Sequence, residues 1–120
     1  TVGSDGILVG EQPHPRGWGT FPRFLGRYAR ELGILSLEEA VMHATSRAAV
    51  RLGLADRGVV AEGAWADLVV LDPECVGSAA TYTRPKVPPM GIRDVFVNGK
   101  PVLRDGNRTK LSPGVGVRRR

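Results

Sequence analysis

Residues 93–104 have the sequence RDVFVNGKPVLR, in which two short apolar runs flank the pair Asn98-Gly99. Asn followed by Gly is the residue pair best able to adopt the positive φ angles of a tight two-residue turn. The flanking runs are rich in the β-branched and aromatic residues that strands favour. We therefore predict a β-hairpin, with residues 95–97 in one strand and residues 102–103 in the other.

The segment before this hairpin also has the pattern of β-structure. Leu68–Leu71 is a continuous apolar run ended by Asp72-Pro73, and it predicts a strand that is buried on both faces. Val59-Val60 predicts a shorter strand, followed by a turn at Glu62-Gly63. Residues 74–91 are rich in proline and lack periodicity, so we expect a surface excursion there rather than a helix or strand.

The N-terminal part of the chain has two different patterns. Residues 1–19 are rich in glycine and proline, and they predict the end of a strand opening into a long loop. Apolar residues then recur at helical spacing from Phe21 to Leu32. We expect a helix here, with Thr20 as its N-cap and Gly33 as its stop.

Two shorter helices should follow. Ser36 and Glu39 have the spacing of a capping box, in which each side chain binds the backbone amide of the other residue. A second helix should therefore begin at this point. Thr45 or Ser46 can cap a third helix, which should end at Gly53.

Composition limits the class of protein. The chain has 120 residues, of which 42% are hydrophobic and 24% charged, which is typical of one globular domain. The net charge is +5, but the basic residues are scattered and only Arg118 to Arg120 form a run, which we interpret as a solvated tail. Basic and aromatic residues are not interleaved on one predicted face, so we expect no nucleic-acid partner.

The single cysteine, Cys75, cannot form an internal disulfide, and a reducing cytoplasm is the simplest interpretation. No apolar run approaches the roughly 20 residues that span a bilayer, so we expect no membrane partner. The first residues do not resemble a signal peptide. The sequence begins at Thr1, directly in the predicted strand end and loop, and we therefore expect that an N-terminal part of the protein is missing.

Asp5 is the first residue that could carry chemistry. It lies in Gly3-Ser4-Asp5-Gly6, and a carboxylate at a strand end among small residues is a position where a barrel enzyme places a metal ligand or a general base. The alternative is that Asp5 only caps a turn through its side-chain oxygen. The spacing alone favours the turn.

His14 lies in a loop that also contains Arg16 and, further on, Arg23. An arginine can offer a two-pronged donor to a substrate carboxylate, so the loop could bind an acidic substrate. Alternatively, His14 and the arginines hydrogen-bond loop carbonyls and anchor the loop. His43 is expected to be a surface or partly buried helix residue, and Cys75 has no histidine nearby in sequence that would make it a nucleophile.

Together these segments resemble the C-terminal portion of the N-acyl-D-amino-acid deacylases, or D-aminoacylases, of the metal-dependent amidohydrolase superfamily. The resemblance covers nearly the whole chain. The first blocks, which are specific to the deacylases, are Ser4-Asp5-Gly6, His14-Pro15-Arg16 and Gly19-Thr20-Phe21-Pro22-Arg23. Later blocks are shared across the superfamily and include Leu37-Glu38-Glu39-Ala40-Val41, Arg51-Leu52-Gly53-Leu54, Ala66-Asp67-Leu68-Val69-Val70 and Val97-Asn98-Gly99.

The resemblance implies a (β/α)₈ metal-dependent hydrolase barrel followed by strands of a small β-sandwich. Residues 1–53 would supply the last barrel strand, an active-site loop and C-terminal barrel helices. Residues 54–120 would supply part of the composite sandwich and a flexible tail. The fold class implied is α/β.

The resemblance also implies a reaction, the zinc-dependent hydrolysis of the amide bond of an N-acyl-D-amino acid. Asp5 would contact the metal region and carry the proton from the attacking water to the leaving amine. Ser4, His14 and Arg16 would bind the substrate, with Arg16 facing its carboxylate. The main zinc ligands would lie before Thr1, so the isolated chain is expected to be inactive without its N-terminal partner segment. The competing hypothesis is a non-catalytic remnant or interaction module of amidohydrolase origin.

Overall fold

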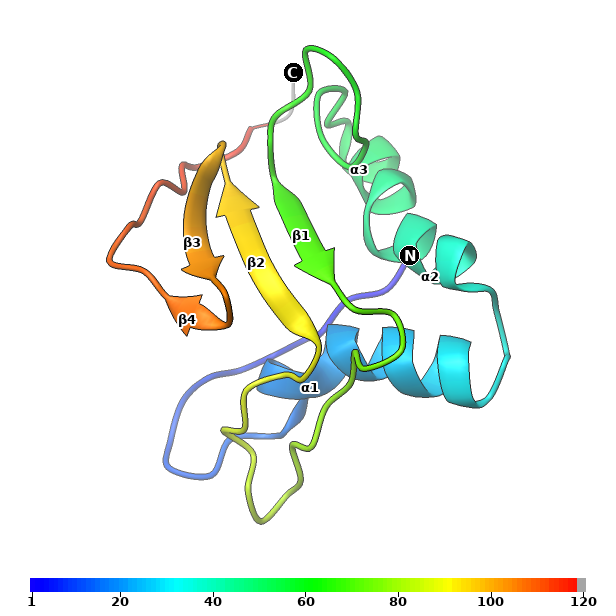
Figure 1. Ribbon diagram of the computed structural model, residues 1–120, viewed down its shortest axis with the longest axis vertical. Helices are drawn as coiled ribbons and strands as arrows, with labels where there is room; N and C mark the ends of the chain where they lie inside the picture. The colour runs from blue at the N-terminus through cyan, green and yellow to red at the C-terminus, as the bar shows by residue number, and fades with distance from the viewer. Residues whose placement is uncertain (119–120) are drawn as a thin grey trace.

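The computed structural model describes residues 1–118, which form a group of helices and a small antiparallel sheet (Figure 1). The helical part contains α1 (Arg16–Arg23), the π-helix η1 (Phe24–Glu31), α2 (Leu37–Ala44) and α3 (Ser46–Leu52). The sheet has the strand order β1-β2-β3-β4. Its strands are β1 (Leu68–Leu71), β2 (Ile92–Val97), β3 (Lys100–Arg104) and β4 (Asn107–Arg108).

The predicted hairpin is confirmed. β2 and β3 pair antiparallel, with Val97 opposite Lys100, and Asn98 and Gly99 between them have φ angles of 49° and 76°. Two successive positive φ angles are those of the turn that matches the twist of paired strands. A second hairpin, which we did not predict, joins β3 to β4 through Asp105-Gly106, with φ angles of 49° and 75°.

The other β predictions were correct only in part. The strand at Leu68–Leu71 forms, but Val69 is 55% exposed, so the prediction of burial on both faces was wrong. Among the described residues β1 lies at the edge of the sheet and pairs only with β2, which leaves part of it uncovered. The predicted strand at Val59-Val60 is absent from the described structure, and Val60 is 89% exposed. An apolar pair without a partner strand has no ladder to join.

The short helices follow the predictions closely. The Glu39 amide donates to Ser36 Oγ and the Ser36 amide donates to Glu39 Oε2, both at 3.1 Å, so the capping box is present. The third helix ends at Gly53, whose φ is 70°. Thr45 does not cap that helix with its side chain, because its hydroxyl donates to the Val41 carbonyl instead.

The first helix begins earlier than predicted. It starts at Arg16, directly after Pro15, whose φ of −59° is already helical. Thr20 is therefore inside the helix, where its hydroxyl donates to the Arg16 carbonyl at 2.9 Å, and it is not the N-cap. The helix continues as η1 and ends before Gly33, whose φ is 58°, as expected.

Residues 74–91, which we call the strap, are more than a surface excursion. Val76 and Ala80 have no exposed surface, and they are the most completely buried apolar residues of the strap. Glycines on α1 and η1 allow the strap backbone to approach closely: a Cβ on Gly19 would lie 2.4 Å from Ser78 Oγ, and one on Gly26 would lie 2.2 Å from the Val76 carbonyl oxygen. As predicted, the strap contains no helix or strand and most of its residues are exposed, but the expected surface excursion was wrong for Val76 and Ala80, which are buried.

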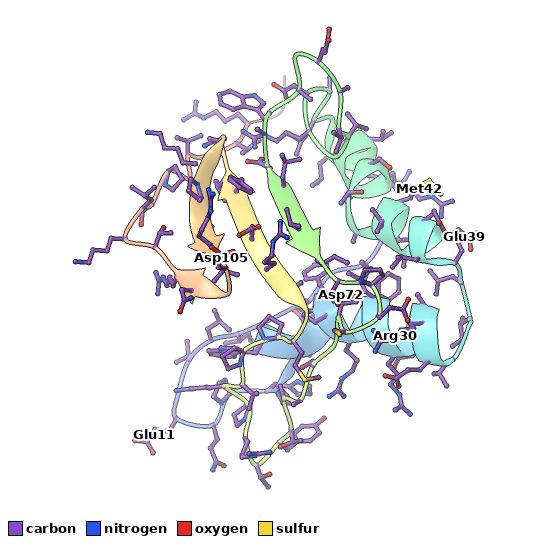
Figure 2. The ribbon with its side chains drawn as sticks, viewed as in Figure 1. Glu11, Arg30, Glu39, Met42, Asp72 and Asp105 are labelled. Carbon is purple, nitrogen blue, oxygen red and sulfur yellow. The ribbon has the colours of Figure 1, made fainter. Side chains whose placement is uncertain are left out.

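Two arginines on the same helical face as these glycines bind the strap. Arg23 Nη2 donates to the Ala80 carbonyl at 2.9 Å, and Arg30 Nη1 donates to the carbonyls of Pro73 and Val76 at 2.9 and 2.8 Å. Figure 2 shows Arg30 extending from η1 towards the chain at Asp72. Positions 19, 23, 26 and 30 recur at the spacing of one helix face, so small and cationic residues alternate along the contact.

The described residues do not test the complete barrel or sandwich. They form an α/β unit with an antiparallel sheet, and residues 1–9 contain no regular strand where we predicted a strand end. The division at residue 53 stays a prediction. Part of the tail is held, since Asn98 Nδ2 donates to the Pro113 carbonyl at 2.7 Å, whereas Arg119 and Arg120 of the predicted solvated run lie outside the described residues.

Candidate functional site

The structure brings Asp5, His14 and Arg16 together where the N-terminal loop meets the start of α1. Asp5 Oδ2 lies 3.1 Å from Arg16 Nη2, and the Asp5 side chain is 84% exposed. Ser4, which precedes Asp5, accepts a hydrogen bond from the Gly6 amide at 3.3 Å. Glu11, in the outer turn of the same loop, points away from the helices (Figure 2). The carboxylate and the guanidinium therefore meet at an accessible surface.

Local backbone geometry places Asp5 at this position. Its φ is 45°, a left-handed conformation that aspartate tolerates better than most residues. The loop lies close to the helix, because a Cβ on Gly6 would come within 3.1 Å of Gly17 Cα. A Cβ on Gly17 would lie 2.4 Å from Leu8 Cδ2. Glycine at both positions allows the loop to cross the first turn of α1, which brings Asp5 to Arg16.

His14 joins the start of α1 to the strap. Its Nδ1 accepts a hydrogen bond from the Arg16 amide at 3.1 Å, and its Nε2 lies 3.0 Å from the Tyr82 hydroxyl. The two rings are 5.0 Å apart and meet edge to face at 77°. Because Nδ1 accepts from a backbone N–H, the proton of the neutral imidazole belongs on Nε2, which then donates to the Tyr82 oxygen.

Arg16 retains donor groups beyond its contact with Asp5. Its side chain is 37% exposed, and its Nε is buried without a hydrogen-bond partner among residues 1–118. A guanidinium has five N–H donors in a planar fork, which suits a carboxylate. The N-terminus of α1 adds a partial positive charge at the same place. The arrangement can bind an anion while keeping an exposed carboxylate beside it.

Tyr82 was missed by sequence reasoning. It lies in the strap, 68 residues after His14, in a segment without helical or strand periodicity. An aromatic residue in a proline-rich segment carries no signal for its partner, so only the folded chain reveals this contact. Arg23, which we considered as a possible substrate ligand, is instead bound to the Ala80 carbonyl.

The two remaining candidates lie outside this site. Asp72 holds Cys75 in a hydrogen bond and so raises the pKa of the thiol, which opposes a nucleophilic role. His43 on α2 lies 2.6 Å from Arg47 Nη1, and partial desolvation, followed by the charge of Arg47, lowers the pKa of its imidazole. His43 is therefore the partly buried helix residue that we expected.

The described residues cannot hold a metal ion by themselves. Within residues 1–118 there is no group of three or more His, Cys, Asp and Glu side chains with the geometry of a metal site. Within the candidate site, the Asp5 carboxylate and the His14 imidazole are of the types that can contribute a ligand, and the resemblance to the deacylases implies this role only for Asp5. No helix in the same range has both the length and the apolar character needed to cross a membrane.

Comparison with known proteins defines the class to which this chain belongs. Residues 1–103 match the model of the amidohydrolase family, so the chain is a member of that family. The expectation of an amidohydrolase, made from short blocks of sequence, is confirmed.

Particular relatives are the deacylases of N-acyl-D-amino acids. The chain is 52% identical over 104 residues to D-aminoacylase and 52% identical over 98 residues to N-acyl-D-glutamate deacylase, both from Alcaligenes xylosoxydans xylosoxydans. These alignments cover 87% and 82% of this chain. A crystal structure of D-aminoacylase superimposes with a TM-score of 0.88 at 50% identity, covering 91% of this chain. The resemblance to the deacylases is therefore confirmed.

A further solved structure shows a relative with its metal. It is N-acyl-D-glutamate deacylase from Bordetella bronchiseptica in complex with zinc and a phosphonate that mimics the tetrahedral intermediate, with a TM-score of 0.83 at 46% identity over 89% of this chain. The match covers 23% of that protein. In general the chain spans only about a fifth of the relatives' length, 22% for D-aminoacylase and 20% for N-acyl-D-glutamate deacylase.

Proposed function

We propose that this chain is the C-terminal portion of an N-acyl-D-amino-acid deacylase, an enzyme that hydrolyses the amide bond between an acyl group and a D-amino acid. The observation that carries the proposal is the pairing of Asp5 with Arg16, which places a proton acceptor beside an anion-binding group. The similarity to D-aminoacylase, which covers the same segment, supports this role. Residues 1–53 would complete the barrel and residues 54–120 the sandwich, in a cytoplasmic enzyme.

In this mechanism Asp5 carries the proton. Amide hydrolysis adds water to the carbonyl carbon and breaks the C–N bond, so a proton must leave the water and reach the leaving nitrogen. One carboxylate near both atoms can accept the first proton and donate it in the second step. Within residues 1–118 the Asp5 carboxylate pairs with Arg16 and is 84% exposed, so this portion of the enzyme leaves it accessible for the proposed role.

Arg16 would bind the α-carboxylate of the substrate. Only its Nη2 is engaged by Asp5 in the described structure, so other donors of the fork remain for a second carboxylate. Ser4 and His14 complete the substrate-binding loop in this proposal. A guanidinium held close to Asp5 would fix the distance between the substrate carboxylate and the group that transfers the proton, which is the positional advantage that catalysis needs.

A zinc-like ion is the proposed cofactor, and the described residues would supply only a small part of its ligand set. Asp5 could contact the ion, and the other ligands would have to come from a segment before Thr1. When bound, such an ion supplies a water with a pKa of about 7 and polarises the carbonyl. The zinc seen in N-acyl-D-glutamate deacylase supports this choice of metal.

The intact mass of the protein from its native source tests the proposal, together with its zinc content and its release of amino acid from N-acetyl-D-methionine. We expect a chain several times longer than 120 residues, bound metal and turnover of the D-substrate but not of N-acetyl-L-methionine. Asp5→Asn should lower kcat at least about 100-fold, the minimum expected for loss of a general base. A mass near 12.9 kDa without metal or turnover would identify a non-catalytic module instead.

A further inference from the structure

The strap contacts the candidate site through the Tyr82 side chain. Arg23 and Arg30 hold the strap against α1 and η1 at the Ala80 and Val76 carbonyls. Tyr82, two residues beyond Ala80, extends to His14 and ends 3.0 Å from its Nε2. The strap backbone is thus anchored on both of these helical segments, and the Tyr82 side chain, which is 72% exposed, is oriented by its contact with His14.

His14 connects Tyr82 to Arg16 through its two ring nitrogens. Its Nδ1 accepts from the Arg16 amide, the first amide of the helix, which would otherwise lack an intrahelical partner. Helix α1 has no side-chain cap from Pro15, so this imidazole satisfies the free amide instead. The orientation of the ring therefore affects both where the helix starts and where the Arg16 side chain begins.

We propose that Tyr82 is a positioning residue of the active site: it orients His14, which holds the start of α1 so that Arg16 meets Asp5 and the carboxylate of the substrate. This role depends on the proposed deacylase function, in which Arg16 binds that carboxylate. In this role His14 contributes to the substrate-binding loop through Arg16 and not by direct contact with the substrate, since both of its ring nitrogens already have partners. Tyr82 itself does not touch the substrate.

Substitutions in the full-length enzyme separate positioning from stability. Tyr82→Phe removes only the hydroxyl, and we expect KM for N-acetyl-D-methionine to rise about threefold to tenfold, as for loss of one hydrogen bond, with kcat within about twofold. The control is Thr83→Val at the tip of the strap, which removes the contact between Thr83 Oγ1 and Thr81 Oγ1 and leaves His14 untouched. Its KM should not change. An equal rise in both variants would mean that the strap matters only as a scaffold and would overturn the proposal.

A double-mutant cycle tests the route through His14. Asparagine at position 14 can accept from the Arg16 amide through an Asx-turn, but it is too short to meet Tyr82. Adding Tyr82→Phe to His14→Asn should therefore leave KM unchanged, which gives a coupling equal to the whole effect of the single Tyr82 change. If Tyr82→Phe raised KM by the same factor in both backgrounds, the proposed route would be wrong.

A substrate-free measurement distinguishes failure of this role from failure of the proposed function. If the wild-type enzyme hydrolysed no N-acyl-D-amino acid, the proposed deacylase function would be wrong. The nitrogen-15 NMR spectrum would still test whether Tyr82 affects the Arg16 amide through His14. We expect His14 to carry its proton on Nε2, and we expect the Arg16 amide resonance to shift in Tyr82→Phe but not in Thr83→Val. A proton on Nδ1, or an unshifted Arg16 amide, would overturn the inference.

Discussion

Replacing Gly26 with alanine should destabilise the protein, although alanine is the better helix former. A Cβ at this position would lie 2.2 Å from the Val76 carbonyl oxygen and 3.1 Å from Gly77 Cα, and contacts of Cβ atoms below 3.0 Å essentially do not occur. Arg30 donates to the same Val76 oxygen at 2.8 Å. The strap therefore cannot move away from the new methyl group without stretching that bond.

The expected magnitude combines three effects. Overpacking by one methyl group costs about 1–3 kcal/mol, and a weakened hydrogen bond to a charged donor costs up to about 1.5–3 kcal/mol. Replacing glycine in a helix interior returns about 1 kcal/mol. The net destabilisation should be about 1.5–5 kcal/mol, given these ranges.

Equilibrium unfolding in urea of the purified protein measures this change as a shift in the midpoint at constant slope. The matched control is Gly33→Ala at the end of the same helix, where no atom lies within 4 Å but φ is +58°. That variant should lose only about 1 kcal/mol from backbone strain. Should Gly26→Ala instead stabilise the protein by the usual helix preference, the close contact between strap and helix would be refuted.

Three further predictions concern groups outside the candidate site. The Asp105 amide, followed by the Arg93 guanidinium, lowers the pKa of buried Asp94. The stability that the Asp94 carboxylate contributes should therefore be complete above pH 3.8, its unfolded pKa, and should be lost as the pH falls through the lower folded pKa. Asp94→Asn should flatten that part of a curve of stability against pH. Alkylation of Cys75 at pH 8 should be slower than that of free cysteine, and Asp72→Asn should accelerate it severalfold, as followed by mass spectrometry. Asn98→Gly should cost about 1 kcal/mol in urea unfolding through loss of the bond to the Pro113 carbonyl, and Asn98→Ala about 1 kcal/mol more through strain at positive φ.

Local signals accounted for the elements that were predicted correctly. The Asn98-Gly99 turn, the Ser36 capping box and the stop at Gly53 each depend on residues within a few positions of one another, so their physics is contained in the sequence. The start of α1 was placed five residues late, because Pro15 already has a helical backbone and the apolar pattern begins only at Phe21. The Asp105-Gly106 turn had the same kind of signal as Asn98-Gly99 and could have been found.

The candidate site was recognised only in its parts. Its N-terminal members are close in sequence, and resemblance to the deacylases singled out Ser4, Asp5, His14 and Arg16. Nothing in that segment indicated that Asp5 and Arg16 would pair, because their meeting depends on the crossing of Gly6 over Gly17. Their catalytic and substrate-binding roles remain proposals.

The sequence by itself indicated the family through its resemblance to known deacylases. It also determined the Asn98-Gly99 turn, the Ser36 capping box and the stops at Gly33 and Gly53, since each of these follows from residue types at short spacing. Only the tertiary structure decided that the strap packs into the glycine positions of α1 and η1, that its carbonyls bind Arg23 and Arg30, and that Tyr82 reaches His14. The residues that join strap and helices are 46 to 68 positions apart in the sequence, and they form no complementary pattern that a linear sequence displays. Their contact depends on the shape of the folded backbone, which places carbonyl groups that have no partner in a helix or strand opposite the two arginines.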